Sequence, residues 1–129
     1  MKAQTPAQVH EIFINAFQSD DIETLLSLYE PHAVLMPQPG ETITGHTAIH
    51  QALGTFLELK DTFDMKVGRV IAAEGLGILL SPWELIGKDP LGNPVQLSGI
   101  TSDVVRKQKD GSWLYAIGNP WGVSGLALS

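Results

Sequence analysis

Leu28-Tyr29-Glu30-Pro31-His32-Ala33-Val34-Leu35 decides the fold, because a short helix ends in this stretch and a strand begins. Pro31 stops the helix, since the residue before a proline is pushed out of the helical region. Downstream, Gly45-His46-Thr47-Ala48-Ile49 opens another helix, and Asp110-Gly111-Ser112-Trp113 contains the strongest short turn signal of the chain. Helices are therefore expected in the first half of the chain and hairpins in the second.

Three amphipathic helices are predicted before residue 60. The first begins at a Thr5 cap followed by proline. Its apolar stripe consists of Val9, Ile12, Phe13, Ala16 and Phe17. This stripe leaves His10 on the outer side of the helix. The second helix follows the acidic cap Asp20-Asp21 and is short, and the third starts near His46 or Thr47.

The apolar period changes from helical to alternating after Asp61. The expected strands cover residues 33–36, 63–67, 76–87, 95–107 and 113–119. Pro37, Pro39 and Gly40 predict an irregular loop that continues to Gly45. Helices first and consecutive hairpins afterwards indicate an α+β fold, with the helices packed on one face of a curved, largely antiparallel sheet.

Composition narrows the class of protein. The 129 residues are expected to form one domain, 1–129, with a net charge of -6 and no basic stripe, so nucleic acid is not an expected partner. No cysteine is present, which excludes disulfides and thiolate chemistry. The N-terminus lacks an apolar signal core and no apolar run reaches the length of a membrane span, so we expect a cytoplasmic protein without a membrane partner.

The last predicted strand is apolar on both faces. Trp113, Tyr115 and Ile117 alternate with Leu114 and Ala116. Only one face of a sheet can pack against the helices, so the other would expose an apolar patch unless a second subunit covers it. A symmetric homodimer is the expected assembly.

The order of these motifs resembles one family. A helix with Leu-Tyr near its end, Gly-x-x-Ala-Ile before a third helix, and a meander with Asp-x-x-Arg-Lys, Asp-Gly and Trp are similar to the nuclear transport factor 2-like superfamily, in its SnoaL-like and ketosteroid-isomerase-like branch. The resemblance runs from about Val9 to about Trp121. It implies a cystatin-like cone, in which three helices and a bent sheet enclose an apolar pocket, usually in dimers.

The resemblance also implies where isomerase chemistry would lie. The isomerases use a tyrosine on the first helix, an aspartate after the first strand and a protonated aspartic acid on a late strand. The corresponding positions here are Phe13, Pro37 and Asp103. Phenylalanine has no hydroxyl and proline has no ionisable group, so we do not expect steroid isomerase chemistry.

Asp103 is the first candidate site residue. Alternation places Thr101, Asp103 and Val105 on one face, which lines the cone in the resembled fold. An acid among apolar walls tends to stay protonated, and it could then donate a hydrogen bond to a ligand carbonyl. The alternative is a structural acid, satisfied by backbone donors or by an arginine in the sheet.

Two further residues could support catalysis. Glu41, in the loop over the expected pocket mouth, could supply a base, or it could simply project into water. The Tyr115 hydroxyl could replace the missing donor, or it could only pack in the core. His46 and His50 have a spacing that can seat a metal, but no acid completes the set, so no metal site is predicted.

The sequence leaves two functions open. One is a non-catalytic module that binds a small, mostly apolar molecule, and the other is an isomerase, cyclase or hydratase that acts on a carbonyl-bearing substrate through Asp103. No nucleotide-binding or hydrolase motif is present, so no cofactor is predicted. The expected ligand-binding residues are Phe13, Phe17, Tyr29, Met36, Phe56, Trp83, Thr101 and Asn119.

Overall fold

Helices form where the sequence predicts them. The computed structural model describes residues 2–128. Its helices are α1 (Pro6–Gln18), α2 (Ile22–Ser27) and α3 (His46–Leu59). The Thr5 hydroxyl accepts a hydrogen bond from the Gln8 amide, and the Asp21 carboxylate caps α2 through the Thr24 amide. No helix of the described residues is long and apolar enough to cross a membrane.

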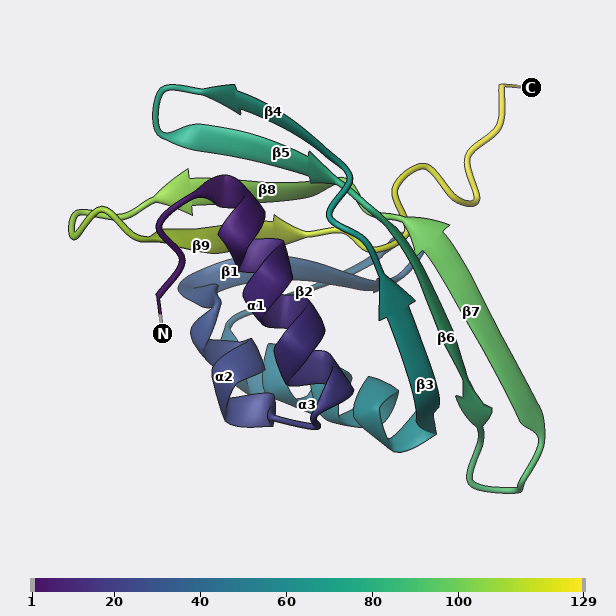
Figure 1. The fold of residues 1–129 in the computed structure, drawn as a ribbon. Coiled ribbons are helices and arrows are strands. Elements are labelled where there is room, and N and C mark those ends of the chain that lie inside the picture. Colours follow the sequence, from purple (N-terminus) through teal and green to yellow (C-terminus); the bar gives the residue numbers. More distant parts are fainter. Residues whose placement is uncertain (1, 129) are drawn as a thin grey trace.

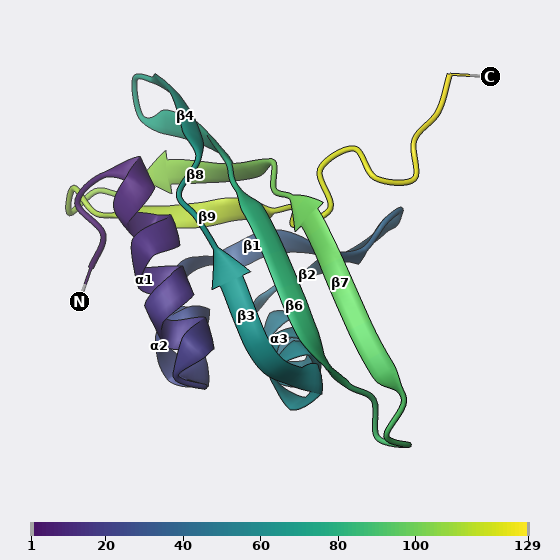
Figure 2. The ribbon, with the colours of Figure 1, turned by 45° about the vertical axis from the view of Figure 1, so that its right-hand side comes forward.

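Strands in the described residues form two sheets that meet at an angle (Figures 1 and 2). One sheet has six strands in the order β2-β1-β9-β8-β5-β4, and the other has three in the order β3-β6-β7. The strands are β1 (Tyr29–Gln38), β2 (Glu41–Thr44), β3 (Lys60–Met65), β4 (Arg69–Ala73), β5 (Leu76–Leu80), β6 (Pro82–Lys88), β7 (Pro94–Ile100), β8 (Asp103–Lys107) and β9 (Trp113–Gly118). Every pairing is antiparallel except that of β1 with β9. The helices pack on the concave side, which confirms the predicted α+β class.

Each of the two long strands predicted in the second half is in fact two strands. The chain leaves the six-stranded sheet at Ser81 and continues in the other sheet as β6, and it returns between β7 and β8 at Thr101 and Ser102. The two crossing points are joined, because the Thr101 amide donates to the Ser81 carbonyl over 2.8 Å. We call this junction of the sheets the corner. Pro82 gives the physical reason for the first break, since proline cannot donate to a strand ladder.

The first strand is longer than predicted. β1 begins at Tyr29 rather than Ala33, and the predicted loop contains the short strand β2. Pro31 lies in an irregular part of the pairing with β9, and Pro37 in an irregular part of the pairing with β2. These irregularities place the prolines where no ladder hydrogen bond is required, so the strand continues past them.

The prediction that Tyr115 and Ile117 share a face is wrong. Val105 pairs with Tyr115 and Val104 with Ile117, so one residue of β9, Ala116, has no partner and forms a bulge. The bulge leaves Tyr115 2% exposed on the concave side and Ile117 43% exposed on the convex side. A single extra residue therefore changes which face each later side chain occupies.

Candidate ligand-binding site

An apolar cavity of about 60 Å³ lies on the concave side. This volume has room for on the order of four water molecules. Its wall is mostly aromatic and aliphatic and is formed by Phe13, Phe17, Tyr29, Leu35, Leu53, Phe56, Phe63, Met65, Trp83, Leu85, Thr101, Asp103, Tyr115, Gly118 and Pro120. Both sheets, α1 and α3 contribute to it. Among the described residues of the wall, Asp103 is the only Asp, Glu, Lys, Arg or His.

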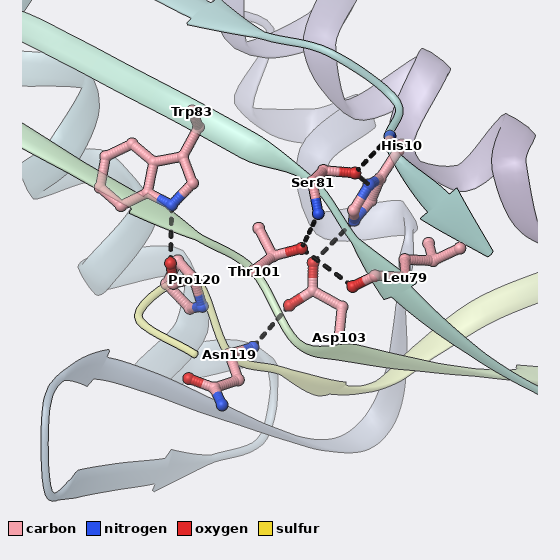
Figure 3. Close-up of polar contacts among 9 residues, drawn as sticks. His10, Leu79, Ser81, Trp83, Thr101, Asp103, Asn119 and Pro120 are labelled. Atoms are coloured by element: carbon pink, nitrogen blue, oxygen red, sulfur yellow. Dashed lines mark hydrogen bonds and ion pairs between the residues drawn. The ribbon is translucent and has the colours of Figure 1, made fainter. Parts of the chain in front are cut away.

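A polar cluster lies at the corner (Figure 3), and its Asp103 also lines the cavity. The His10 imidazole lies between two partners: its Nδ1 is 2.8 Å from Ser81 Oγ, and its Nε2 is 2.7 Å from Asp103 Oδ2. The backbone amide of Gly68 donates to Ser81 Oγ over 3.1 Å. His10, Ser81 and Asp103 are 0%, 1% and 5% exposed, so these hydrogen bonds form away from bulk water.

The prediction that His10 lies on the outer side of α1 is wrong. His10 and Phe17 are seven residues apart and both are buried, and Phe13 lies on the same side of the helix, in the cavity wall. The face of α1 that carries His10 packs against the corner. The predicted apolar stripe left this residue out because it counted only apolar side chains. Helical spacing of His10 with Phe13 and Phe17 is the signal that could have identified it.

The second oxygen of Asp103 is also engaged. Asp103 Oδ1 accepts the backbone amide of Asn119 over 2.6 Å. The amide group of the Asn119 side chain bonds instead to the backbone of Gly122, and Asn119 does not line the cavity. Asn119 therefore fixes the carboxylate through its backbone rather than through the predicted side-chain contact with a ligand.

Thr101 is in the wall, but its hydroxyl is already used. Thr101 Oγ1 donates to the Leu79 carbonyl over 3.0 Å and accepts the Ser81 amide over 3.1 Å. These two bonds tie the crossing points of the corner together. The hydroxyl therefore serves the fold, and Thr101 offers a ligand mainly its methyl group.

Two tyrosines face the cavity beside Asp103. The rings of Tyr29 and Tyr115 lie 4.8 Å apart, centroid to centroid, and both line the wall. Burial raises the pKa of each hydroxyl well above its usual value, and the nearby Asp103 carboxylate raises it further. Within residues 2–128 neither hydroxyl makes a hydrogen bond to the protein, so both remain available as donors to a ligand.

The other predicted site residues divide between the wall and the surface. Phe13, Phe17, Phe56 and Trp83 are in the wall, and the Trp83 indole donates to the Pro120 carbonyl over 2.6 Å. Met36 is half-buried in β1 and Glu41 is exposed in β2, and neither lines the cavity. The candidate acid–base groups that the structure brings together are thus Asp103 and Tyr115, without Glu41.

The helix-start histidines have separate surroundings. His46 Nε2 donates to the Tyr29 carbonyl over 2.8 Å, which ties α3 to β1, and His50 is exposed. Among the described residues, no group of three or more His, Cys, Asp or Glu side chains could hold a metal ion.

Sequence comparison places the chain in a family. The sequence model described as the SnoaL-like domain matches residues 10–115, which span both His10 and Tyr115. This chain belongs to the SnoaL-like domain family. No curated protein matches its sequence.

Solved structures share the fold of this SnoaL-like domain. A ketosteroid isomerase-like protein from Erwinia carotovora atroseptica is similar at a TM-score of 0.75 and 19% identity, over 86% of this chain and 88% of that one. A candidate calcium/calmodulin-dependent protein kinase II association domain from Xanthomonas campestris reaches 0.72 at 17%, over 97% and 96%. A candidate dehydratase of the nuclear transport factor 2-like family from Streptomyces avermitilis reaches 0.69 at 15%, over 86% and 88%. These identities establish the nuclear transport factor 2-like fold and nothing finer.

Proposed function

We propose that this SnoaL-like domain binds a small, mostly apolar molecule that carries one or two polar atoms. The observation that supports this proposal is the cavity itself. One carboxylate and two unpaired tyrosine hydroxyls, from Asp103, Tyr29 and Tyr115, meet inside an otherwise apolar wall. A few convergent polar groups in an apolar cavity are typical of small-molecule sites.

The volume limits the ligand. About 60 Å³ suits a molecule, or the end of a molecule, of roughly five heavy atoms. A Kd of about 1 mM corresponds to a binding free energy of about -4 kcal/mol, or about -0.8 kcal/mol per heavy atom for such a ligand. This is weaker than the limit of about -1.5 kcal/mol per heavy atom that the best small ligands reach. Phe13, Phe56, Met65 and Pro120 are the half-buried residues of the wall, so the cavity is not closed off by fully buried side chains alone.

A matched pair of methionine variants tests the proposal. Met65→Trp places an indole in the cavity wall, whereas Met36→Trp makes the same change in a half-buried side chain outside it. The probes are isobutylamine, isobutanol, isobutyraldehyde and isobutyrate, followed by NMR at up to about 10 mM. Shifts at cavity residues that Met65→Trp abolishes and Met36→Trp preserves are expected. If no probe moves any cavity resonance of the unmodified protein, the proposal is wrong.

A second candidate is catalysis on a carbonyl-bearing substrate, as in an isomerase, cyclase or hydratase. The observation that favours it is that Asp103 and Tyr115 line one largely apolar cavity, where both could reach the same bound substrate. Isobutyraldehyde in D₂O tests it, because catalysed enolisation exchanges the hydrogen next to the carbonyl. Exchange accelerated by the protein and lost in Asp103→Asn supports catalysis, and exchange at the rate of buffer alone contradicts it.

The assembly we propose is a homodimer formed through the convex side of the six-stranded sheet. Ile71 pairs with Ile78, Ile78 with Val104, Val104 with Ile117, and Ile117 with Val34. We call these five residues the convex row. Ile71, Ile78 and Ile117 are 52%, 38% and 43% exposed. A continuous apolar row of this kind favours burial against a second copy. Sedimentation velocity at about 10 µM is expected to give a dimer, and a monomer would contradict the proposal.

A further inference from the structure

The hydrogen bonds of the corner favour one placement of its protons. The Gly68 amide can only donate, so Ser81 Oγ accepts from it. The Ser81 hydroxyl hydrogen then has one recorded acceptor among residues 2–128, which is His10 Nδ1. An imidazole whose Nδ1 accepts a hydrogen bond is neutral and carries its proton on Nε2. In this arrangement every donor of the corner has an acceptor, and His10 donates to Asp103 as a neutral ring.

Asp103 is consequently an acceptor on both oxygens. His10 Nε2–H reaches Oδ2 at 2.7 Å and the Asn119 amide reaches Oδ1 at 2.6 Å (Figure 3). Both distances are at or below the short end of the range for N–H donors, as is typical when the acceptor is ionised. The Asn119 contact agrees with the second of the two readings of the sequence, in which a backbone donor satisfies the acid.

The charge of this carboxylate has no cation to balance it within the described residues. The lysines and the arginine that form salt bridges there pair elsewhere, with Asp110, Asp20 and Glu30. Within the described residues the only basic side chain on Asp103 is His10, which is neutral in the arrangement above. Burial of a carboxylate without a counter-charge costs free energy. Each oxygen of Asp103 accepts one hydrogen bond from the protein, so each still has a lone pair for a further donor.

The wall around Asp103 favours a positively charged ligand, as the carboxylate does. Seven aromatic side chains line the cavity together with Asp103, and these are Phe13, Phe17, Tyr29, Phe56, Phe63, Trp83 and Tyr115. Phe13 and Tyr115 meet edge to face with 6.0 Å between ring centroids. Aromatic faces attract cations, and no lysine, arginine or histidine lines the wall to receive an anion.

We infer that the ligand of this cavity is a small apolar amine, bound as its ammonium ion with the nitrogen on Asp103 and the alkyl group among the aromatic rings. This inference rests on the proposed ligand-binding function and names its ligand class. Three ammonium hydrogens match the two carboxylate oxygens and a tyrosine hydroxyl oxygen. His10 and Ser81 are positioning residues, since they act on the ligand only by holding Asp103 as an acceptor.

The isobutyl series tests the inference, because its members differ mainly in the polar end. An alkyl ammonium is charged at neutral pH, as lysine is. A charge-assisted hydrogen bond is roughly twice as strong as a neutral one, so isobutylamine should bind about tenfold more tightly than isobutanol, and isobutyrate should not bind. Alcohol or aldehyde binding as tight as amine binding would overturn the inference and leave the proposed function intact. Absence of binding by every member would overturn both.

Two variants assign the effect to its residues. Asp103→Asn removes the charge and should bring the affinity for isobutylamine down to that for isobutanol. Phe13→Leu keeps an apolar wall without the ring, so it should weaken the amine several-fold and the alcohol little. Phe13 lies outside the hydrogen-bonded corner, so this variant decides the matter even if Asp103→Asn fails to fold. Equal losses for amine and alcohol in Phe13→Leu, or unchanged amine binding in folded Asp103→Asn, would overturn the inference.

Discussion

The two sides of the six-stranded sheet carry different kinds of side chain, although the same strands form both sides. In β8, Asp103 and Val105 are buried on the concave side, while Val104 lies between them in the convex row. The concave side concentrates polar atoms in one buried cluster, where each makes a specific hydrogen bond. The convex row has no side-chain polar atom at all. The concave side therefore presents buried hydrogen-bonding groups, whereas the convex row presents only apolar surface.

Removal of the carboxylate is expected to have the largest effect. Asp103→Ala leaves two buried donors, His10 Nε2 and the Asn119 amide, without an acceptor, so the free energy of unfolding should fall by about 2 to 5 kcal/mol. Urea denaturation measures this loss. Asp64→Ala, at an exposed aspartate of β3, is the control and should change stability by less than about 0.5 kcal/mol. Equal losses in the two variants would remove the contrast between buried and exposed acids.

A charge in the convex row should instead alter association. Ile117→Lys places an ammonium in the proposed interface of both copies and should weaken dimerisation at least about a hundredfold, or about 2.7 kcal/mol. Leu91→Lys makes the same kind of change in an exposed residue outside the row. Sedimentation equilibrium of the two variants tests the prediction. The convex side is not the interface if Ile117→Lys remains as dimeric as Leu91→Lys.

Loss of the serine hydroxyl should cost less than loss of the carboxylate. Ser81→Ala leaves His10 Nδ1 without its donor and the Gly68 amide without its acceptor, so stability should fall by about 1 to 2 kcal/mol. Ser98→Ala, at an exposed serine of β7, is the matched control. Thermal unfolding compares the two. A neutral Ser81→Ala would mean that His10 is not held by the chain of hydrogen bonds at the corner.

Alkaline titration reports on the concave side alone, because the chain has two tyrosines and both line the cavity. Burial, and then Asp103, raises the pKa of Tyr29 and Tyr115, so folding favours their neutral forms. Their contribution to stability is complete below the unfolded pKa of about 10 and is lost as the pH rises above it. Tyrosinate absorbance should therefore appear together with loss of circular dichroism. Tyrosinate in folded protein near pH 10 would contradict this account.

The sequence predicts those parts of the fold that depend on local patterns. The caps at Thr5 and Asp21 and the turn at Gly111 depend on neighbouring residues, and the helices and the hairpin lie where these signals place them. The breaks at Ser81 and Thr101 depend on the meeting of two sheets, which alternation along one strand does not report. Pro82 was the available local sign of the first break.

The candidate site was predictable in part for the same reason. Asp103 could be assigned to the concave side because alternation fixes the face of a strand residue. Helical spacing could have assigned His10 to the same side, but its hydrogen bonds to Asp103 and Ser81 could not be predicted, since these partners lie 93 and 71 residues away in the chain. The face of Ile117 was predicted wrongly because the bulge at Ala116 is set by pairing with β8 and has no signal of its own in β9.

The protonation state of His10 tests the central claim most directly, since the inferred ligand depends on an ionised Asp103 beside a neutral imidazole. Nitrogen-15 NMR of the histidine rings at pH 7 distinguishes the two ring nitrogens, and Ser81→Ala helps to assign the His10 signals. The account predicts a neutral ring with its proton on Nε2 and an unprotonated Nδ1. A ring protonated on both nitrogens would mean that His10 already balances the charge of Asp103, and it would contradict the account.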